Sequence, residues 1–322
     1  MNLMNDQATS SRRLEGGQAA GMVEAAAYGP AELSRNLRQL QQYYPCLEMR
    51  SIGRSVLGKK LWAVTFGRGS RAIHVNAACH ANEWITSLLL MRFLEDLGQA
   101  YTQGGKLRGT SVKELYEEVT LWAVPMVNPD GVELVVDGLQ EHHPYYEQLL
   151  QWNYGSAQFR RWKANARGVD LNDQFPAHWE EECRRRGTEG PGPRDYPGES
   201  PLSEPEAQSL AALTRTIPFE LVVALHTQGQ EIYWNYRDCE PPEAESLARR
   251  LGNVSGYKPV KLTGSDAGYK DWFIQQFRKP GFTVEAGYGV NPLSLSRFEE
   301  IYDEVQALLV EVLRCHRGDN MV

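Results

Sequence analysis

The sequence Ala72-Ile-His-Val-Asn-Ala-Ala-Cys-His80-Ala-Asn-Glu83 joins an apolar run to two residues that can hold a metal. A short apolar run of this kind is typical of a buried strand. Two other runs are built alike, because residues 220–225 lead into His226 and residues 281–284 lead into Glu285. In open α/β sheets, ligands bind beyond the carboxyl ends of the strands, where the connecting loops converge. We therefore expect all three runs to deliver their polar residues to one place.

The rest of the chain alternates between helical and strand patterns. Leu33, Leu37 and Leu40 recur at helical spacing and predict a first helix that Pro45 ends. Two β-rich runs on either side of Gly58 predict a hairpin. This alternation favours a single-domain α/β fold, with a mixed, mostly parallel twisted sheet and helices on both faces. Further helices are predicted at about 83–97, 204–215, 241–254, 271–277 and 296–314, and further strands at about 118–127, 219–225 and 231–235.

Three local signals mark the connections. Asn128-Pro-Asp-Gly131 is a strong turn signal. Residues 176–203 hold many Pro, Gly, Glu and Arg without an apolar period, which predicts a long surface loop able to wall a cleft. In Ser203-Glu-Pro-Glu206, serine is a good N-cap and Glu206 completes a capping box, so we expect a helix to begin at Ser203.

The composition is that of an ordinary globular protein. Its 322 residues include 41 Asp and Glu against 34 Lys and Arg, and no basic run with interleaved aromatics suits a nucleic acid. No stretch approaches the roughly 20 apolar residues of a membrane span. The sequence therefore predicts no nucleic-acid partner, no membrane association and no obligate protein partner.

The two ends of the chain differ in character. Residues 1–25 are rich in Gly, Ser and Ala and predict a flexible leader, while residues 26–318 predict one folded domain. The leader lacks the continuous apolar core of a secretory signal. Five cysteines, an odd number without metal-type spacing, fit a reducing compartment better than a disulfide framework. We therefore expect a cytoplasmic protein.

His80, Glu83 and His226 form a candidate metal-ligand set. A hydrolytic zinc site needs about three protein ligands and an open position for water, and His with Glu is a favoured combination. Taken alone, the H-x-x-E spacing is common by chance, and His226 would more often be a satisfied histidine at a sheet end. Glu285 favours a functional site over these ordinary explanations, because a carboxylate after an apolar run must be paired, bound to metal or poised as a base.

An ordered set of motifs resembles the zinc carboxypeptidases of the carboxypeptidase A type (metallopeptidase family M14). The matches are HANEW at 80–84, VNPDG at 127–131, RGVDLN at 167–172, the strand ending in His226, and TVEAGYG at 283–289. The resemblance implies a zinc carboxypeptidase-like catalytic domain at 26–318, with one Zn²⁺ per chain. It implies that His80, Glu83 and His226 bind this ion. It also implies that Glu285 is the general base that takes a proton from a zinc-bound water.

A cation besides zinc is needed for the oxyanion that develops during peptide hydrolysis. In the family this is an arginine that follows a tryptophan upstream of the GVDLN motif. Here Lys163 holds the corresponding place, so the resemblance implies a catalytic role for Lys163. Arg161 and Arg167 are alternatives.

The chain departs from the family at the site that holds the substrate's terminal carboxylate. Carboxypeptidases of this type use an Asn-Arg pair there, whereas this chain has Asn172 followed by Asp173. At about 4 Å and an effective dielectric near 20, one charge contact is on the order of 4 kcal/mol, so Asp173 would repel an ordinary C-terminal carboxylate. We expect Asp173 to face an amine of a diamino acid instead, although a solvated loop carboxylate is the alternative. Lys270 lies where the family shapes the same pocket and is a third candidate substrate contact, with a solvated helix-start lysine as its alternative.

The runs HANEWIT, RGVDLNDQFPAHWEEE and VEAGYGVNPL resemble the bacterial γ-D-glutamyl-L-diamino acid endopeptidases. The resemblance implies a zinc metallopeptidase whose partner is a peptide substrate, a muropeptide that contains a diamino acid such as diaminopimelate or lysine. The bond cleaved would join γ-D-glutamate to that diamino acid. Rival readings are a metallocarboxypeptidase that releases ordinary C-terminal residues, and a muropeptide-binding protein without activity.

Overall fold

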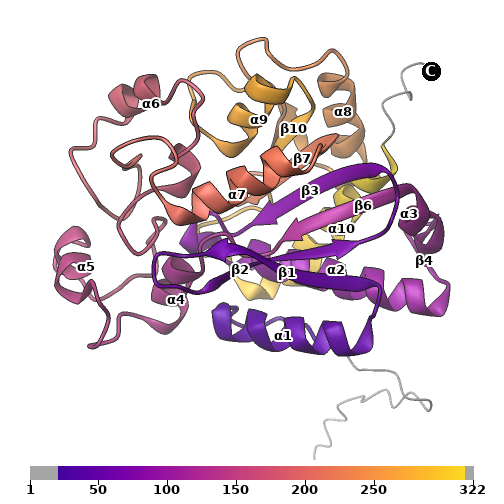
Figure 1. The fold of residues 1–322 in the computed structure, drawn as a ribbon, viewed down its shortest axis with the longest axis horizontal. Coiled ribbons are helices and arrows are strands. Elements are labelled where there is room, and N and C mark those ends of the chain that lie inside the picture. The colour runs from indigo at the N-terminus through magenta and orange to yellow at the C-terminus, as the bar shows by residue number, and fades with distance from the viewer. Residues whose placement is uncertain (1–20, 316–322) are drawn as a thin grey trace, which may run out of the picture.

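The computed structural model describes residues 21–315. A mixed sheet forms its centre (Figure 1). The sheet has eight strands in the order β1-β2-β6-β3-β7-β10-β8-β9. The central strands β6, β3, β7 and β10 run parallel. Antiparallel pairs join β1 to β2, β2 to β6 and β8 to β10, and β9 pairs parallel with β8. The strand bounds are β1 Leu47–Arg54, β2 Lys60–Phe66, β3 Arg71–Ala77, β6 Val119–Val124, β7 Leu221–His226, β8 Glu231–Tyr233, β9 Lys258–Val260 and β10 Gly281–Glu285, and a separate pair is β4 Lys106–Leu107 with β5 Thr110–Ser111.

Residues 21–315 also form ten α-helices. They are α1 Pro30–Tyr43, α2 Ile85–Gln103, α3 Val112–Glu118, α4 Pro129–Asp137, α5 Tyr146–Trp152, α6 Trp179–Arg186, α7 Pro205–Thr216, α8 Ala244–Ser255, α9 Tyr269–Phe277 and α10 Phe298–Arg314. Three short 3₁₀ helices are η1 Ala81–Glu83, η2 Leu171–Asp173 and η3 Leu295–Arg297. The predicted α/β fold with helices on both faces is confirmed.

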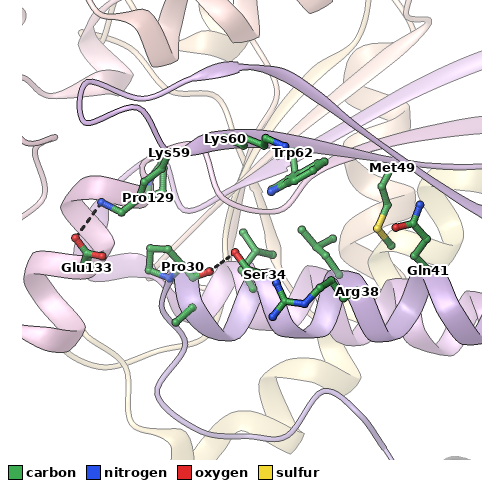
Figure 2. Close-up of a pocket in the computed structure, with 13 residues that line it drawn as sticks. Pro30, Ser34, Arg38, Gln41, Met49, Lys59, Lys60, Trp62, Pro129 and Glu133 are labelled. Carbon is green, nitrogen blue, oxygen red and sulfur yellow. Dashed lines mark hydrogen bonds and ion pairs between the residues drawn. The ribbon is translucent and has the colours of Figure 1, made fainter.

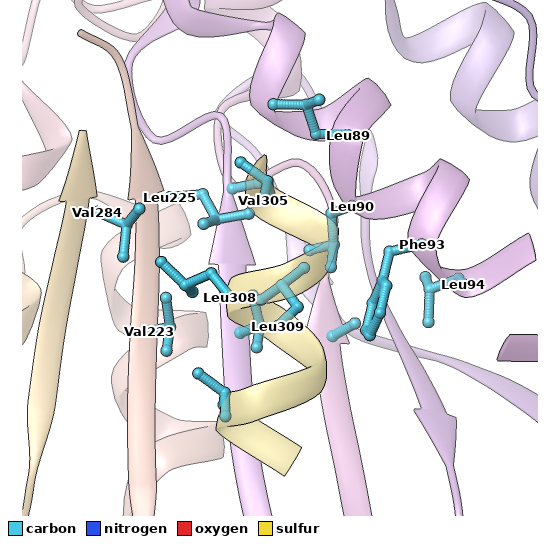
Figure 3. Close-up of a cluster of buried hydrophobic side chains, with 14 of the residues drawn as sticks. Leu89, Leu90, Phe93, Leu94, Val223, Leu225, Val284, Val305, Leu308 and Leu309 are labelled. Atoms are coloured by element: carbon cyan, nitrogen blue, oxygen red, sulfur yellow. The ribbon is translucent and has the colours of Figure 1, made fainter. Parts of the chain in front are cut away.

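Strand β7 shows why both faces are covered. Its residues alternate between the two sides of the sheet, as successive strand residues must. Val223 and Leu225 belong to the core under α2 and α10, where they meet Leu90 and Leu308 (Figure 3). Val222 and Ala224 belong instead to the core under α7 and α9. Each fully buried Leu or Val contributes about 1.5–3 kcal/mol, so a strand that is apolar on both faces is held from both sides.

Several predicted element boundaries were wrong. The predicted turn at Asn128 is the start of α4, because the Asn128 side chain accepts the N–H of Gly131 and Pro129 takes the first helical position. The predicted surface loop at 176–203 contains α6. Helix α7 has Glu204 rather than Ser203 at its N-cap, without a side-chain cap, so the predicted capping box does not form.

The folded part of the chain begins earlier than position 26. Residues 1–20 of the predicted leader, and residues 316–318 at the predicted domain end, lie outside the described residues. Val23 is fully buried, and the backbone N–H groups of Met22 and Val23 donate to the carboxylate of Glu95 on α2. The buried carboxylate thereby fixes the segment that precedes α1.

A groove of about 700 Å³ lies between α1, the β1–β2 hairpin and the start of α4 (Figure 2). Ser34 and Arg38 of α1 line it opposite Trp62, and Lys59 closes one end through an ion pair with Glu133 at 2.9 Å. None of its lining residues is a predicted site residue. Every helix within residues 21–315 is too short or too polar to span a membrane.

A buried carboxylate holds the tip of the hairpin. Glu206 on α7 is fully buried and accepts the N–H of Val56 at 3.0 Å, while its second oxygen has no hydrogen-bond partner among residues 21–315. Burial raises the pKa of Glu206 from 4.5 to about 8. The native protein therefore keeps a proton that the unfolded chain releases between these two pH values, so this group makes stability fall as pH rises from 4.5 to 8.

We expect Glu206→Gln to remove this loss, because the amide is neutral at every pH. Between pH 5 and pH 8 the variant should gain up to about 4 kcal/mol relative to the wild type. Urea denaturation at pH 5, 6.5 and 8 measures the difference, with the exposed Glu189→Gln as control. If the wild type and Glu206→Gln lose the same stability between pH 5 and pH 8, the prediction is wrong.

Candidate metal centre and catalytic carboxylate

The three runs singled out in the sequence lie side by side. Strands β3, β7 and β10 are neighbours and parallel, so their carboxyl ends meet at one edge of the sheet. His226 and Glu285 are direct partners in the register of β7 and β10. His80 lies three residues after the end of β3, and Glu83 is the last residue of η1, which follows directly.

The nitrogen and oxygen atoms of His80, Glu83 and His226 converge. His80 Nδ1 lies 2.9 Å from Glu83 Oε1, and His226 Nδ1 lies 3.0 Å from Glu83 Oε2. The two Nδ1 atoms are 3.1 Å apart. Ligands placed at 2.0–2.1 Å around a tetrahedral zinc ion are separated from one another by roughly 3.3 Å. The three residues therefore fit a single zinc ion, and their role as its ligands remains a prediction.

These groups are almost fully buried, so their charges are strongly coupled. Burial disfavours protonated His80, but Glu83 and Asp170 outweigh it and raise the pKa of His80 to about 9. Burial also disfavours ionised Glu83, yet the two histidines lower its pKa. Without a metal, a proton on His80 thus supplies the positive charge that the carboxylate needs. A divalent ion would have to displace that proton.

A second layer of residues orients the candidate ligands. Asp170 Oδ1 lies 3.1 Å from His80 Nε2, the ring nitrogen opposite the convergence point. The backbone N–H of Thr227 donates to Glu83 at 3.2 Å, and the amide of Asn291 reaches the same carboxylate at 3.5 Å. No role was predicted for these three residues from the sequence. The Asp of the RGVDLN motif was the available signal, since a metal-binding histidine usually donates its other N–H to a carboxylate.

We expect Asp170→Asn to weaken zinc binding by about 10- to 100-fold, because the amide holds the imidazole of His80 less firmly in its ligating tautomer. Competition with a chelator dye measures this affinity. Asp238→Asn is the control, since Asp238 is 88% exposed and pairs with Lys261. Equal affinity in the Asp170 variant and the wild type would contradict the expectation.

Asn128 links the metal segment to the segment of Lys163. Its side-chain amide donates to the carbonyl oxygens of Cys79 and Ala164, both at 3.1 Å, and lies 3.4 Å from that of Lys163. The N–H of Ala81 also donates to the Lys163 carbonyl, at 3.0 Å. Three backbone carbonyl groups from two distant segments are thereby held around one side chain.

The charges of Glu285 and Lys163 act on the candidate ligands, although neither residue belongs to the converging set. Burial and the charge of Glu83 raise the pKa of Glu285 to about 8, against the opposing effect of His80 and Lys163. No hydrogen bond to the Glu285 carboxylate is found within residues 21–315. A bound cation would favour its ionised form. The carboxylate is therefore free to exchange a proton with a ligand.

The structure separates Lys163 from the two alternatives. Lys163 is partly buried, and the charges of Asp170 and Glu83 help to raise its pKa although burial opposes this. Arg161 is exposed. Arg167 points elsewhere, with its guanidinium 3.5 Å from the Tyr145 hydroxyl. Lys163 is therefore the best placed of the three to meet an oxyanion, and this role stays a prediction.

The predicted substrate contacts are less open than the sequence indicated. Asp173 is buried rather than free, because Arg186 of α6 pairs with it at 2.7 and 2.8 Å. Burial and the nearby Asp170 raise the pKa of Asp173 to about 7. Neither a solvated carboxylate nor an unopposed negative charge is therefore present. A substrate role for Asp173 remains a prediction.

Asn172 and Lys270 both lie near the start of α9. Asn172 is partly exposed, and its side-chain nitrogen lies near Gly268. Lys270 is not solvated, because it is 4% exposed, donates to the carbonyl of Asn235 at 2.6 Å and pairs with Asp271 at 2.5 Å. Two of the three N–H groups of its ammonium are therefore engaged within the protein.

A buried set of two imidazoles and a carboxylate, with a second carboxylate beside it, defines the class of mononuclear metallohydrolases. A model of the zinc carboxypeptidase family matches residues 33–282. The chain belongs to this family and is a metallopeptidase. Its fold agrees with that of solved carboxypeptidases.

The comparisons with individual proteins are as follows. The γ-D-glutamyl-L-diamino acid endopeptidase 1 of Lysinibacillus sphaericus is 48% identical over 88% of this chain and 71% of its own length. The uncharacterized protein YqgT of Bacillus subtilis (strain 168) is 39% identical, over 90% and 78%. Bovine thrombin-activatable fibrinolysis inhibitor, solved in complex with tick carboxypeptidase inhibitor, is 19% identical but has a TM-score of 0.69, over 90% of this chain and 97% of that one.

Proposed function

We propose that this metallopeptidase hydrolyses the bond between γ-D-glutamate and a diamino acid in peptides derived from peptidoglycan. The observation that carries this proposal is the 48% identity to a γ-D-glutamyl-L-diamino acid endopeptidase across 88% of the chain. The described site supports it, because the candidate ligands and the carboxylate of Glu285 lie at one edge of the sheet. A binding protein without activity would not need a carboxylate beside the ligand set.

The chain's own residues have separable roles in this proposal. His80, Glu83 and His226 would hold one zinc ion, which supplies a Lewis acid and brings bound water towards a pKa of roughly 7. Glu285 accepts a proton from the attacking water and passes it to the leaving amine. Lys163 offers its ammonium group to the carbonyl oxygen as negative charge develops there.

We also propose that the protein acts in the cytoplasm, on soluble muropeptides. The five cysteines support this location, because all are free in the structure and two of them, Cys79 and Cys315, are buried. Free thiols persist in a reducing compartment.

The test is release of diaminopimelate from L-Ala-γ-D-Glu-diaminopimelate by the purified, zinc-loaded protein. The same peptide with an α-linked L-glutamate is the control for the γ-D bond. Hydrolysis of peptides with blocked and with free C-termini distinguishes the proposed activity from that of a carboxypeptidase, which would require a free terminal carboxylate. Absence of hydrolysis of the γ-D-linked peptide by a folded, metallated protein would refute the proposal.

A further inference from the structure

Helix α6 and the loop that follows it bring an arginine and a carboxylate to the candidate site. Arg186 is the last residue of α6, and its Nη1 lies 2.9 Å from Oδ1 of Asp195. The two side chains are 24% and 33% exposed, so both can still meet a ligand. Figure 1 shows α6 among the loops at the end of the sheet where α4 begins.

This pair is joined to the metal centre through Asp170. One oxygen of Asp170 lies 3.1 Å from His80, and the other accepts the backbone N–H of Asp195 at 3.2 Å. Oxygen atoms of Asp170, Asp173 and Asp195 lie within 4.8 Å of one another. The Arg186–Asp195 pair is therefore in the layer directly behind the candidate ligands.

The guanidinium of Arg186 fills the space between these carboxylates. Its Nε lies 2.7 Å from both Asp173 and Glu182, and its Nη2 donates to Asp173 at 2.8 Å. The hydrogen bonds to Asp173 and Asp195 engage one N–H on each terminal nitrogen, which leaves the second N–H of each without a partner among the described residues, while Nε takes part in ion pairs alone. The acidic cluster is therefore no second metal site, because a cation already occupies it.

The arrangement offers opposite charges side by side to a ligand. The remaining N–H groups of Arg186 can bind a carboxylate, since guanidinium is the preferred partner of that group. Asp195 can bind an ammonium group, and the surplus of carboxylates around Arg186 favours a cation there. A group that carries an amine and a carboxylate on one carbon matches both partners. Diaminopimelate ends in such a group, whereas lysine ends in an amine alone.

We propose that Arg186 and Asp195 bind the distal amino and carboxylate groups of diaminopimelate and so make the enzyme prefer this diamino acid over lysine. This inference rests on the proposed function and adds the substrate's identity to it. Buried Asp173 and Glu182 then hold Arg186 in position. The preference would come from α6, for which the sequence had predicted only a loop.

The experiment compares three peptides that differ at the diamino acid: L-Ala-γ-D-Glu linked to diaminopimelate, to diaminopimelate amidated at the distal carboxylate, or to lysine. Arg186→Lys keeps the charge that Asp173 and Glu182 need but loses the planar fork. This variant should have a kcat/KM for the diaminopimelate peptide that is lower by roughly 10- to 100-fold, mainly because KM rises. The kcat/KM for the other two peptides should change by less than about threefold. Asp195→Asn should lower kcat/KM for all three peptides alike, because each of them carries the distal amine.

Arg184→Lys is the matched control, because Arg184 is an exposed arginine in the same turn of α6. Circular dichroism and metal content confirm that each variant is folded and loaded. If the wild type cleaves none of the peptides, the proposed function itself fails. If the wild type cleaves them but Arg186→Lys lowers kcat/KM equally for diaminopimelate and lysine, Arg186 is only structural and this inference is overturned.

Discussion

Replacement of Glu285 by glutamine is expected to reduce turnover of the γ-D-glutamyl peptide by roughly 10²- to 10⁴-fold, the usual contribution of a general base. The amide keeps the size of the side chain but cannot accept a proton. Zinc content should stay at the wild-type level, because Glu285 is not among the three converging side chains. Steady-state kinetics combined with metal analysis therefore separates loss of the base from loss of the ion.

Glu231→Gln is the control for this result. Glu231 lies opposite Glu285 in the ladder between β8 and β10, and its carboxylate accepts the hydroxyl of Tyr233 at 2.7 Å. Its replacement should change kcat by no more than a few-fold. A Glu285→Gln enzyme that retains wild-type kcat at full zinc occupancy would remove Glu285 from the mechanism.

Loss of the metal should have a still larger effect. We expect His226→Ala to bring bound zinc to near zero and activity below detection, because two ligands cannot hold an ion that requires about three. Chelation of the wild type should give the same loss, and added Zn²⁺ should reverse it in the wild type alone. His142→Ala, at an exposed loop position, is the control. Retention of stoichiometric zinc by the His226 variant would contradict the assigned ligand set.

The pH dependence of zinc binding has a definite sign. The pKa of His80 is raised to about 9 in the metal-free protein, so below that pH the ion competes with a proton. Affinity should fall by about tenfold per pH unit as pH decreases through neutrality, for release of one proton. Calorimetry in buffers of different ionisation enthalpy counts that proton.

The sequence was most informative where burial leaves a strong pattern. The runs ending near Ala77, His226 and Glu285 were found because a strand covered on both faces is apolar without interruption. Their order in the sheet was not readable from this pattern, since pairing joins residues far apart in the chain. The expected meeting of the three runs rested instead on the general behaviour of parallel sheets.

Helix α6 shows where pattern fails. Its sequence WEEECRRR has no apolar stripe, and the helix is supported by acidic residues in its first turn and basic residues in its last. The partner of Asp173 therefore stayed hidden, because Arg186 lies thirteen residues away across a segment that had been predicted as a loop. Asn-Pro-Asp-Gly at 128–131 fits a turn and a helix start equally well, and the carbonyl groups around Asn128 decide the outcome.

Asn128 has a chemical neighbour that bears on the lifetime of the enzyme. Deamidation of an asparagine ordinarily starts when the next backbone nitrogen attacks the side-chain carbonyl, and Pro129 has no N–H with which to do so. An aspartate at this position would turn a negative oxygen towards the carbonyl groups of Cys79 and Ala164, where the amide now donates. The proline that begins α4 thus protects the junction from an ageing reaction that would drive its two segments apart.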